Sequence, residues 1–210
     1  MIFDCDGVLV DSEPISVQID IEMLAEVGLV MSEQEVIERF VGRSARVIVR
    51  TVEEELGHPP PADWFDRGEA RLRQAFVDQL RPVPGVIEAL EQITAPACVA
   101  SSSEPGQLRF KLQLVGLYDR FAGRLFSGSE VKNGKPAPDL FLHAAAEMGT
   151  APERCVVIED SHHGVEAGRA AGMDVLAYVG GGMIPAGALA GPRTVVFDDM
   201  RELPELLGRR

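Results

Sequence analysis

The pattern of apolar and polar positions divides the chain into three parts. A short apolar run, Ile2-Phe3, precedes two acids and Gly7, as expected for a buried strand that ends in a turn. Between residues 13 and 80, apolar positions recur every three or four residues, which predicts helices. From residue 81 onwards, short apolar runs alternate with further helical patterns, which predicts strands joined by helices.

The middle part predicts four helices. The first ends near residue 28, and one of its faces carries four apolar residues: Ile15, Ile19, Met23 and Val27. Ser32 and Glu35 have the spacing of a capping box that opens the second helix. The third helix follows near residues 44–57, and Asp63 is expected to cap a fourth that ends near residue 80.

This helical stretch is too long for a simple crossover between two strands. We therefore expect a separate four-helix cap domain over residues 13–80, inserted into a core domain of residues 1–12 and 81–210. The alternative is a helical excursion that packs flat on the sheet.

The last part has the alternation of βαβ units. Five further strands are expected, at residues 97–100, 124–127, 155–158, 174–179 and 194–197. Helices are expected between most of them, at residues 86–93, 105–115, 138–148 and 162–171. This order predicts an α/β fold, a Rossmann-like doubly wound parallel sheet covered on both faces.

Charge and composition restrict the partners. The 210 residues are 46% hydrophobic and carry a formal net charge of −13, so neither nucleic acid nor an anionic membrane is an expected partner. A site for an anionic substrate must then be locally positive.

Cys5, Cys98 and Cys155 lie in apolar runs, as buried thiols in a reducing compartment would. No leader-like segment or run of membrane-spanning length occurs, so we expect a cytoplasmic protein. A monomer is expected, with a dimer left open.

Polar side chains follow three of the predicted strands, where ligands bind in doubly wound sheets. Asp4 and Asp6 point to the same face of an extended segment, and two such carboxylates repel each other unless a cation or a shared proton intervenes. Mg²⁺ is the cation that such oxygen ligands favour. The alternative is an edge strand that runs into a solvated turn.

The second and third groups are hydroxyl and basic side chains. Ser101 directly follows its strand and precedes a helix, so it is the first candidate for a phosphate contact, with Ser102 and Ser103 as secondary candidates. A plain cluster of helix-capping serines is the alternative. Lys135 lies in a proline-stiffened segment and is placed to neutralise a phosphoryl oxygen, with Lys132 as its rival.

The last group is Glu159-Asp160. Both acids reach one ion only if the chain has begun to turn, and an acid pair at a helix N-terminus is the alternative. His162 and His163 are expected on a helix surface, and zinc is not expected because neighbouring helical residues do not face one site.

Four ordered motifs resemble those of the haloacid dehalogenase (HAD) superfamily. They are Asp4-x-Asp6 with the following Gly-Val-Leu-Val-Asp-Ser, then Ser101, then Lys135 in Lys-Pro-x-Pro-Asp, then Glu159-Asp160-Ser161. A helical cap after the first motif is similar to the subclass of phosphoglycolate phosphatases, β-phosphoglucomutases and sugar-phosphate phosphatases.

The resemblance implies a phosphoaspartyl mechanism. Asp4 would be the nucleophile and Asp6 the general acid and base. Mg²⁺ would be held by the Asp4 carboxylate, the Asp6 carbonyl, Glu159 and Asp160. Ser101 and Lys135 would bind the phosphoryl oxygens, and the cap would close over a small phosphorylated metabolite.

Within the family, a phosphatase is favoured. Asp6 is the second acid that the family's dehalogenases lack, and residues 13–55 contain no lysine of the kind that phosphonate-cleaving relatives use. Where the mutases carry Lys-Asn, arginine and histidine, this chain has Glu104-Pro105, Ala45 and Ser16. A β-phosphoglucomutase-like sugar phosphomutase is the alternative, and a catalytically idle HAD-like binding module is a further one.

Substrate selection is expected from the cap. The candidates are Arg43 and Glu13, with Ser44 and Arg46 beside them, and their alternative is a set of solvated helix-end residues. A sugar phosphate or a small phosphorylated acid is the expected substrate.

Overall fold

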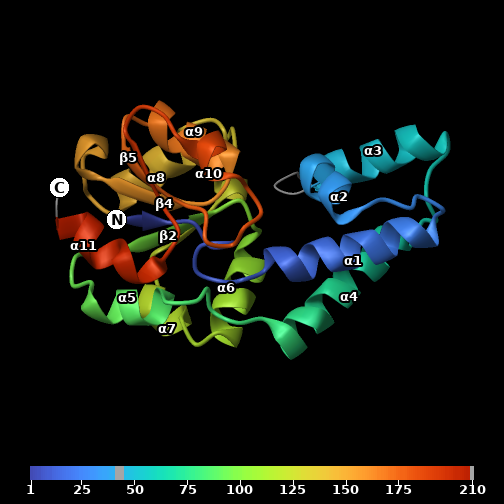
Figure 1. The fold of residues 1–210 in the computed structure, drawn as a ribbon, viewed down its shortest axis with the longest axis horizontal. Coiled ribbons are helices and arrows are strands. Elements are labelled where there is room, and N and C mark those ends of the chain that lie inside the picture. The colour runs from blue at the N-terminus through green and yellow to red at the C-terminus, as the bar shows by residue number, and fades with distance from the viewer. Residues whose placement is uncertain (41–44, 209–210) are drawn as a thin grey trace. The chain divides into compact units, whose positions relative to one another are not determined.

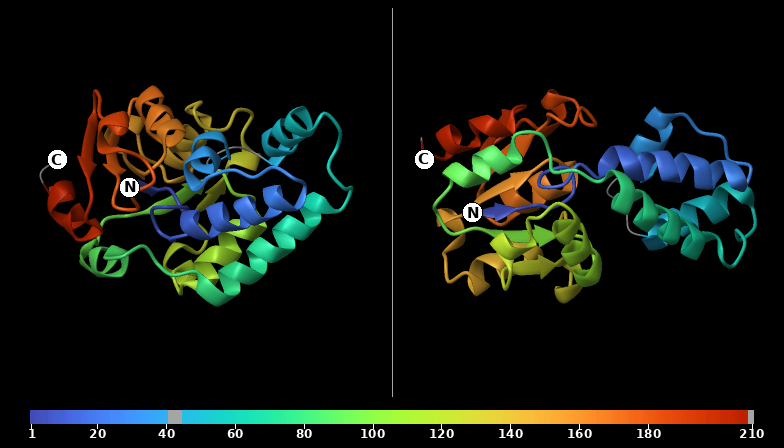
Figure 2. Two further views of the ribbon diagram at one scale, coloured as in Figure 1. Left: turned by 45° about the vertical axis from the view of Figure 1, so that its right-hand side comes forward. Right: turned by 90° about the horizontal axis from the view of Figure 1, so that it is seen from below.

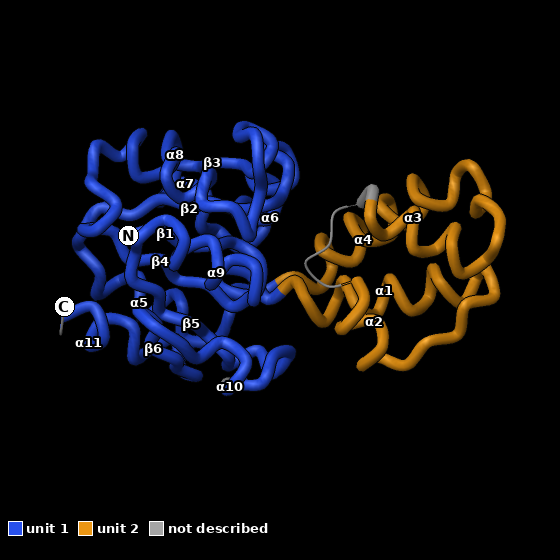
Figure 3. The backbone as a smooth tube through the Cα atoms, turned by 90° about the horizontal axis from the view of Figure 1, so that it is seen from above, with its two compact units in different colours: residues 1–11, 81–210 blue, residues 12–80 orange. Residues whose placement is uncertain are grey.

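The computed structural model describes residues 1–40 and 45–208, which form two compact units (Figure 3). Met1–Asp11 and Arg81–Arg210 make up the first, here called the sheet unit. Ser12–Leu80 make up the second, here called the helical unit.

The sheet unit is built on one parallel sheet with the order β3-β2-β1-β4-β5-β6, the order of a doubly wound fold, among the residues described. Its strands are β1 (Ile2–Phe3), β2 (Cys98–Ser101), β3 (Leu125–Ser127), β4 (Val156–Glu159), β5 (Asp174–Tyr178) and β6 (Thr194–Phe197). In the right-hand view of Figure 2, β1 in blue lies between β2 in green and β4 in orange. The expected α/β fold with a parallel sheet is confirmed.

Helices cover both faces of this sheet. They are α5 (Val86–Gln92), α6 (Pro105–Leu114), α7 (Tyr118–Phe121), α8 (Asp139–Glu147), α9 (His162–Ala170), α10 (Ala186–Leu189) and α11 (Leu203–Gly208). In Figure 1, α8 and α9 lie on one side of the strands, and α5, α7 and α11 lie on the other. The sequence did not predict α7, α10 or α11, because helices of four to six residues are too short to show a period.

Burial on both faces explains the apolar strands. Phe3, Val99 and Ile158 lie side by side on one face of three adjacent strands, and each is fully buried. The preceding residues, Ile2, Cys98 and Val157, point to the opposite face and are also buried. The strands therefore read as continuous apolar runs rather than as alternating ones.

Two short segments of the sheet unit lead into and out of the helical unit, and they lie next to each other. Val10 is bridged to Pro82 in antiparallel fashion. The Asp11 amide donates to the Arg81 carbonyl at 2.9 Å, and the Val83 amide donates to the Leu9 carbonyl at 3.1 Å.

The described part of the helical unit contains α1 (Glu13–Glu26), α2 (Glu33–Phe40), α3 (Ala45–Leu56) and α4 (Trp64–Gln79). The Trp64 indole donates to the Met23 carbonyl at 2.9 Å and joins α4 to α1. Arg67 also pairs with Glu26 across the same two helices, at 2.8 Å.

The local signals in the helical unit were partly right. Ser32 and Glu35 form the expected capping box, in which the Ser32 amide donates to the Glu35 carboxylate at 2.8 Å. Asp63 stands before α4 as expected, but its side chain makes no capping hydrogen bond and pairs with Arg67 instead.

The expected apolar face of α1 was also only partly right. Val17, Met23 and Leu24 are its buried residues, whereas Ile15 and Ile19 are partly exposed. The four-residue spacing of the apolar side chains therefore identified Met23 but not Val17 or Leu24.

No helix in residues 1–40 and 45–208 is both long enough and apolar enough to cross a membrane.

Candidate active site

Three adjacent strands bring the predicted site residues of the sheet unit to one edge. Phe3 is in register with Val99 of β2 and with Ile158 of β4, so the next residues, Asp4 and Glu159, lie at the same level at the carboxyl ends of β1 and β4. Ser101 ends β2 two residues after Val99. The carboxyl ends of β1 and β4 also meet where the strand order reverses, which is the ligand position of such sheets.

A buried lysine connects two of the acids. The Lys135 ammonium lies 2.6 Å from Asp4 Oδ1 and 2.7 Å from Glu159 Oε1, and it donates to the Ala100 carbonyl at 3.2 Å. Its side chain is 5% exposed and lies 4.8 Å from the centre of the Phe141 ring. Burial lowers the pKa of Lys135, but the two carboxylates outweigh that effect and raise it, so the lysine stays charged.

Asp4, Glu159 and Asp160 form a group of acids suited to a cation. Each offers one carboxylate oxygen, and these three oxygens lie within 4.8 Å of one another. When all three are ionised, Lys135 offsets one of three negative charges, so a divalent cation would balance the group. Burial raises the pKa of Asp4 to about 7, and repulsion from Glu159 and Asp6 adds to this, while Lys135 opposes it.

Two glycines make room for these acids. Gly7 has a φ of 72°, and a Cβ there would lie 1.9 Å from an Asp160 carboxylate oxygen. A Cβ on Gly164 would lie 1.6 Å from Glu159 Oε1. Glu159 is held from its other side, because the Ser161 amide and hydroxyl donate to Oε2 at 2.7 and 2.8 Å. Ser161 also caps α9, so the strand end and the helix start fix the acid together.

Replacing Gly164 with alanine is expected to displace the Glu159 carboxylate. We expect the free energy of unfolding to fall by about 1–3 kcal/mol, the usual range for overpacking a filled interior. Urea unfolding measures this change. Gly106 is a helical glycine whose Cβ would meet no atom within 4 Å, so Gly106→Ala is the matched control. Equal effects of the two substitutions would contradict the close contact.

The serines after β2 differ in their surroundings. Ser101 is 1% exposed, and its hydroxyl oxygen accepts from the Ser103 amide at 3.1 Å. Ser102 is exposed. Ser127, at the end of β3, donates its hydroxyl to the Ser103 carbonyl at 2.8 Å. The neighbouring strand therefore stabilises the loop that follows Ser101.

The Asp6 carboxylate is not a member of the group of three acids and has partners of its own. Lys111 of α6 donates to both of its oxygens at 2.5 Å, and the Ser103 hydroxyl donates to one of them at 2.9 Å. The sequence analysis did not identify Lys111. A signal was present, because Lys111 lies on the same helix face as Leu108 and Leu112, which are buried.

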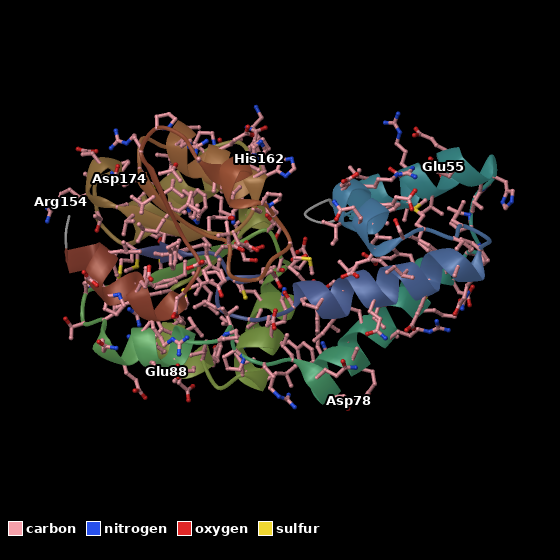
Figure 4. All side chains as sticks on the ribbon, in the orientation of Figure 1. Glu55, Asp78, Glu88, Arg154, His162 and Asp174 are labelled. Atoms are coloured by element: carbon pink, nitrogen blue, oxygen red, sulfur yellow. The ribbon has the colours of Figure 1, made fainter. Side chains whose placement is uncertain are left out.

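The remaining candidates lie elsewhere. Lys132 is exposed. His162 extends from the start of α9 (Figure 4), where its side chain is 56% exposed and lies 3.7 Å from Glu166. Glu13 begins α1 in the helical unit.

The other cap candidates cannot be placed at the site. Arg43 and Ser44 lie outside the described residues, as does the side chain of Arg46. The expected role of the cap residues in substrate selection stays a prediction.

The sequence profile of a family described as haloacid dehalogenase-like hydrolase matches residues 1–178, which include every element of this site. The chain belongs to this family. The resemblance inferred from the four motifs is confirmed.

Two curated relatives that are similar to this hydrolase are phosphatases. The 6-phosphogluconate phosphatase of Escherichia coli (strain K12) is 33% identical over 208 residues, which cover 97% of this chain and 92% of the relative. The fructose-1-phosphate phosphatase YqaB of the same strain is 33% identical over 181 residues, which cover 84% of this chain and 94% of the relative.

A crystal structure is also similar to this hydrolase along its whole length. It is a HAD family hydrolase from Deinococcus radiodurans R1 with bound phosphate and sodium, with a TM-score of 0.82 and 34% identity over 99% of this chain and 94% of the other. With the family and its named phosphatases, the hydrolase is a phosphoric monoester hydrolase, as the sequence predicted.

Proposed function

We propose that this hydrolase is a Mg²⁺-dependent phosphatase that cleaves a small phosphomonoester through a phosphoaspartyl intermediate. The observation that supports it best is the group of Asp4, Glu159 and Asp160 around the buried Lys135. That group combines a nucleophile, oxygen ligands for a cation, and a positive charge for a phosphoryl oxygen.

The donor atoms fit a hard divalent cation. The proposed ligands are the carboxylates of Asp4, Glu159 and Asp160 and the backbone carbonyl of Asp6. All of them are oxygen donors, which such a cation prefers. Both oxygens of Glu159 already accept hydrogen bonds from Lys135 or Ser161, so this acid also fixes its neighbours. When bound, Mg²⁺ would offset negative charge on the transferred phosphoryl group.

The proposed reaction has two displacements at phosphorus. Asp4 forms a bond to phosphorus while the bond to the leaving alcohol breaks, and Asp6 gives a proton to that alcohol. Water then attacks the phosphoaspartate, Asp6 takes a proton from it, and inorganic phosphate leaves with the Asp4 carboxylate restored. Lys135 and Ser101 bind phosphoryl oxygens in both steps.

The substrate class is proposed from the relatives and from the helical unit. Two curated relatives act on phosphorylated sugars or sugar acids, so we propose a sugar phosphate or a small phosphorylated acid. Residues 13–80 would act as a cap that closes over the substrate, with Glu13 and Arg43 contributing to its selection.

The test is phosphate release from a panel of sugar phosphates and small phosphorylated acids, with and without Mg²⁺. Mg²⁺-dependent release is the expected result. Interconversion of glucose 1-phosphate and glucose 6-phosphate without release would indicate a mutase. Absence of both activities would favour a catalytically idle module.

Mg²⁺ affinity is expected to depend on pH. Because Asp4 has a pKa of about 7 in the folded chain, a proton competes with the cation below that pH. We expect the affinity to rise roughly tenfold per pH unit from about pH 5 to 7 and then to level off. Without a cation, Asp4 keeps its proton up to about pH 7 when folded but loses it near 3.8 when unfolded, so its contribution to stability falls as the pH rises between these values.

Isothermal titration calorimetry at several pH values measures this affinity. Asp4→Asn, which cannot titrate there, is expected to remove the pH dependence below 7. An affinity that is constant from about pH 5 to 7 would contradict a proton on Asp4.

A further inference from the structure

Lys111 is a buried cation for which the proposed reaction has no use. Its side chain is 6% exposed, and it lies on the buried face of α6 beside Leu108 and Leu112. A charge in such a position has lost most of its hydration, and an apolar side chain would fill the same space without that cost. Lys111 is therefore a candidate for a role besides packing.

The contacts of Lys111 converge on Asp6. The ammonium lies 2.5 Å from each Asp6 oxygen and donates to the Ser103 hydroxyl at 2.8 Å, and that hydroxyl donates to Asp6 Oδ2 at 2.9 Å. The three side chains thus form a closed set of contacts between the turn after β1, the loop after β2 and α6. Such a set fixes the torsion angles of a short carboxylate side chain.

Fixing Asp6 leaves it accessible. Its side chain is 25% exposed, whereas that of Lys111 is 6% exposed, so the lysine holds the carboxylate from its buried side. Asp6 and Asp4 lie close enough to repel each other, and this repulsion would turn an unrestrained Asp6 away from Asp4. The Lys111 ammonium offsets the negative charge of Asp6 and restrains its carboxylate.

We propose that Lys111 is a positioning residue that, together with Ser103, holds the Asp6 carboxyl group in the orientation for proton transfer to the leaving alcohol. The inference rests on the proposed function, in which Asp6 is the general acid. Lys111 itself contacts neither the substrate nor the cation.

The experiment compares two leaving groups in Lys111→Met. An alkyl alkoxide needs a proton as it leaves, whereas 4-nitrophenolate leaves without one, so only the alkyl ester depends on Asp6 in the first displacement. We expect kcat/KM for glycerol 2-phosphate to fall about 10- to 100-fold, and kcat/KM for 4-nitrophenyl phosphate to fall less than about threefold. The ratio kcat/KM is used because it reports the first displacement and excludes hydrolysis of the phosphoenzyme.

Asp6→Asn separates this inference from the proposed function. The single variant should show the same selective loss on glycerol 2-phosphate, and Lys111→Met added to it should cause no further loss, because Lys111 acts through Asp6. If Asp6→Asn leaves kcat/KM for glycerol 2-phosphate unchanged, Asp6 is not the general acid. If Asp6→Asn shows the selective loss but Lys111→Met lowers kcat/KM equally for both substrates, Lys111 has only a structural role and the inference is overturned.

Two further variants complete the test. Arg109→Met removes an exposed cation from the same helix and should leave the ratio between the two substrates unchanged. If Lys111→Met does not fold, as judged by circular dichroism, Ser103→Ala removes another contact to Asp6. It should lower kcat/KM selectively for the alkyl ester, and an equal loss on both esters would overturn the inference.

Discussion

Asp4→Asn is expected to lower kcat for phosphate release by at least about 10⁴-fold, the largest loss of any single substitution, because an amide cannot form the bond to phosphorus. The fold should survive the change. Burial raises the pKa of Asp4 to about 7, so asparagine resembles the neutral carboxyl that the buried site already accommodates. The Lys135 ammonium also keeps Glu159 as its partner.

Phosphate release under saturating Mg²⁺ and substrate measures the loss, and circular dichroism confirms that the variant is folded. Asp119→Asn, which makes the same change at an exposed position of the sheet unit, should retain full activity. Retention of more than roughly one per cent of kcat by Asp4→Asn would show that Asp4 is not the nucleophile.

Lys135→Met is expected to cause the largest loss of stability. It leaves the buried carboxylates of Asp4 and Glu159 without their shared cation, and removing one member of a buried ion pair costs about 3–5 kcal/mol. For a chain of this size, such a loss lowers the melting temperature by roughly 6–20 °C. Phosphate release should also be lost, since among the described residues no cation other than Lys135 forms an ion pair with Asp4.

Urea unfolding in the absence and presence of Mg²⁺ measures the effect. Mg²⁺ should stabilise Lys135→Met more than the wild-type chain, because the cation would then balance an additional charge. Lys132→Met removes an exposed lysine from the same segment and should change stability by less than about 0.5 kcal/mol. Similar losses in the two variants would contradict the charge balance described for the site.

The sheet could be predicted because its signals are local. Uninterrupted apolar runs such as that ending in Ile158 mark strands covered on both faces, and the polar residues that follow them mark one edge. Once the strands are parallel, their order brings Asp4 and Glu159 together without any knowledge of side-chain contacts.

The environment of each side chain could not be predicted in this way. The contact between Gly164 and Glu159 depends on how closely α9 approaches β4, and the pairing of Lys111 with Asp6 joins residues far apart in the chain. The preference of aspartate for the position before a helix also did not predict the contact of Asp63, whose side chain pairs with Arg67 and makes no capping hydrogen bond. Several partners are compatible with the local sequence of such a side chain, and the folded structure determines which of them it contacts.

The adjacent segments that lead into and out of the helical unit have an evolutionary consequence. The Asp11 amide donates to the Arg81 carbonyl, so the two chain segments are joined within the sheet unit. This contact does not depend on the residues inserted between them. Closing a longer loop adds only a slowly growing entropic cost. An insertion here can therefore lengthen, shorten or be exchanged over generations while the strand register that places Asp4 stays the same. The paired segments therefore allow the helical unit to vary in length and sequence while the sheet unit keeps its strand register.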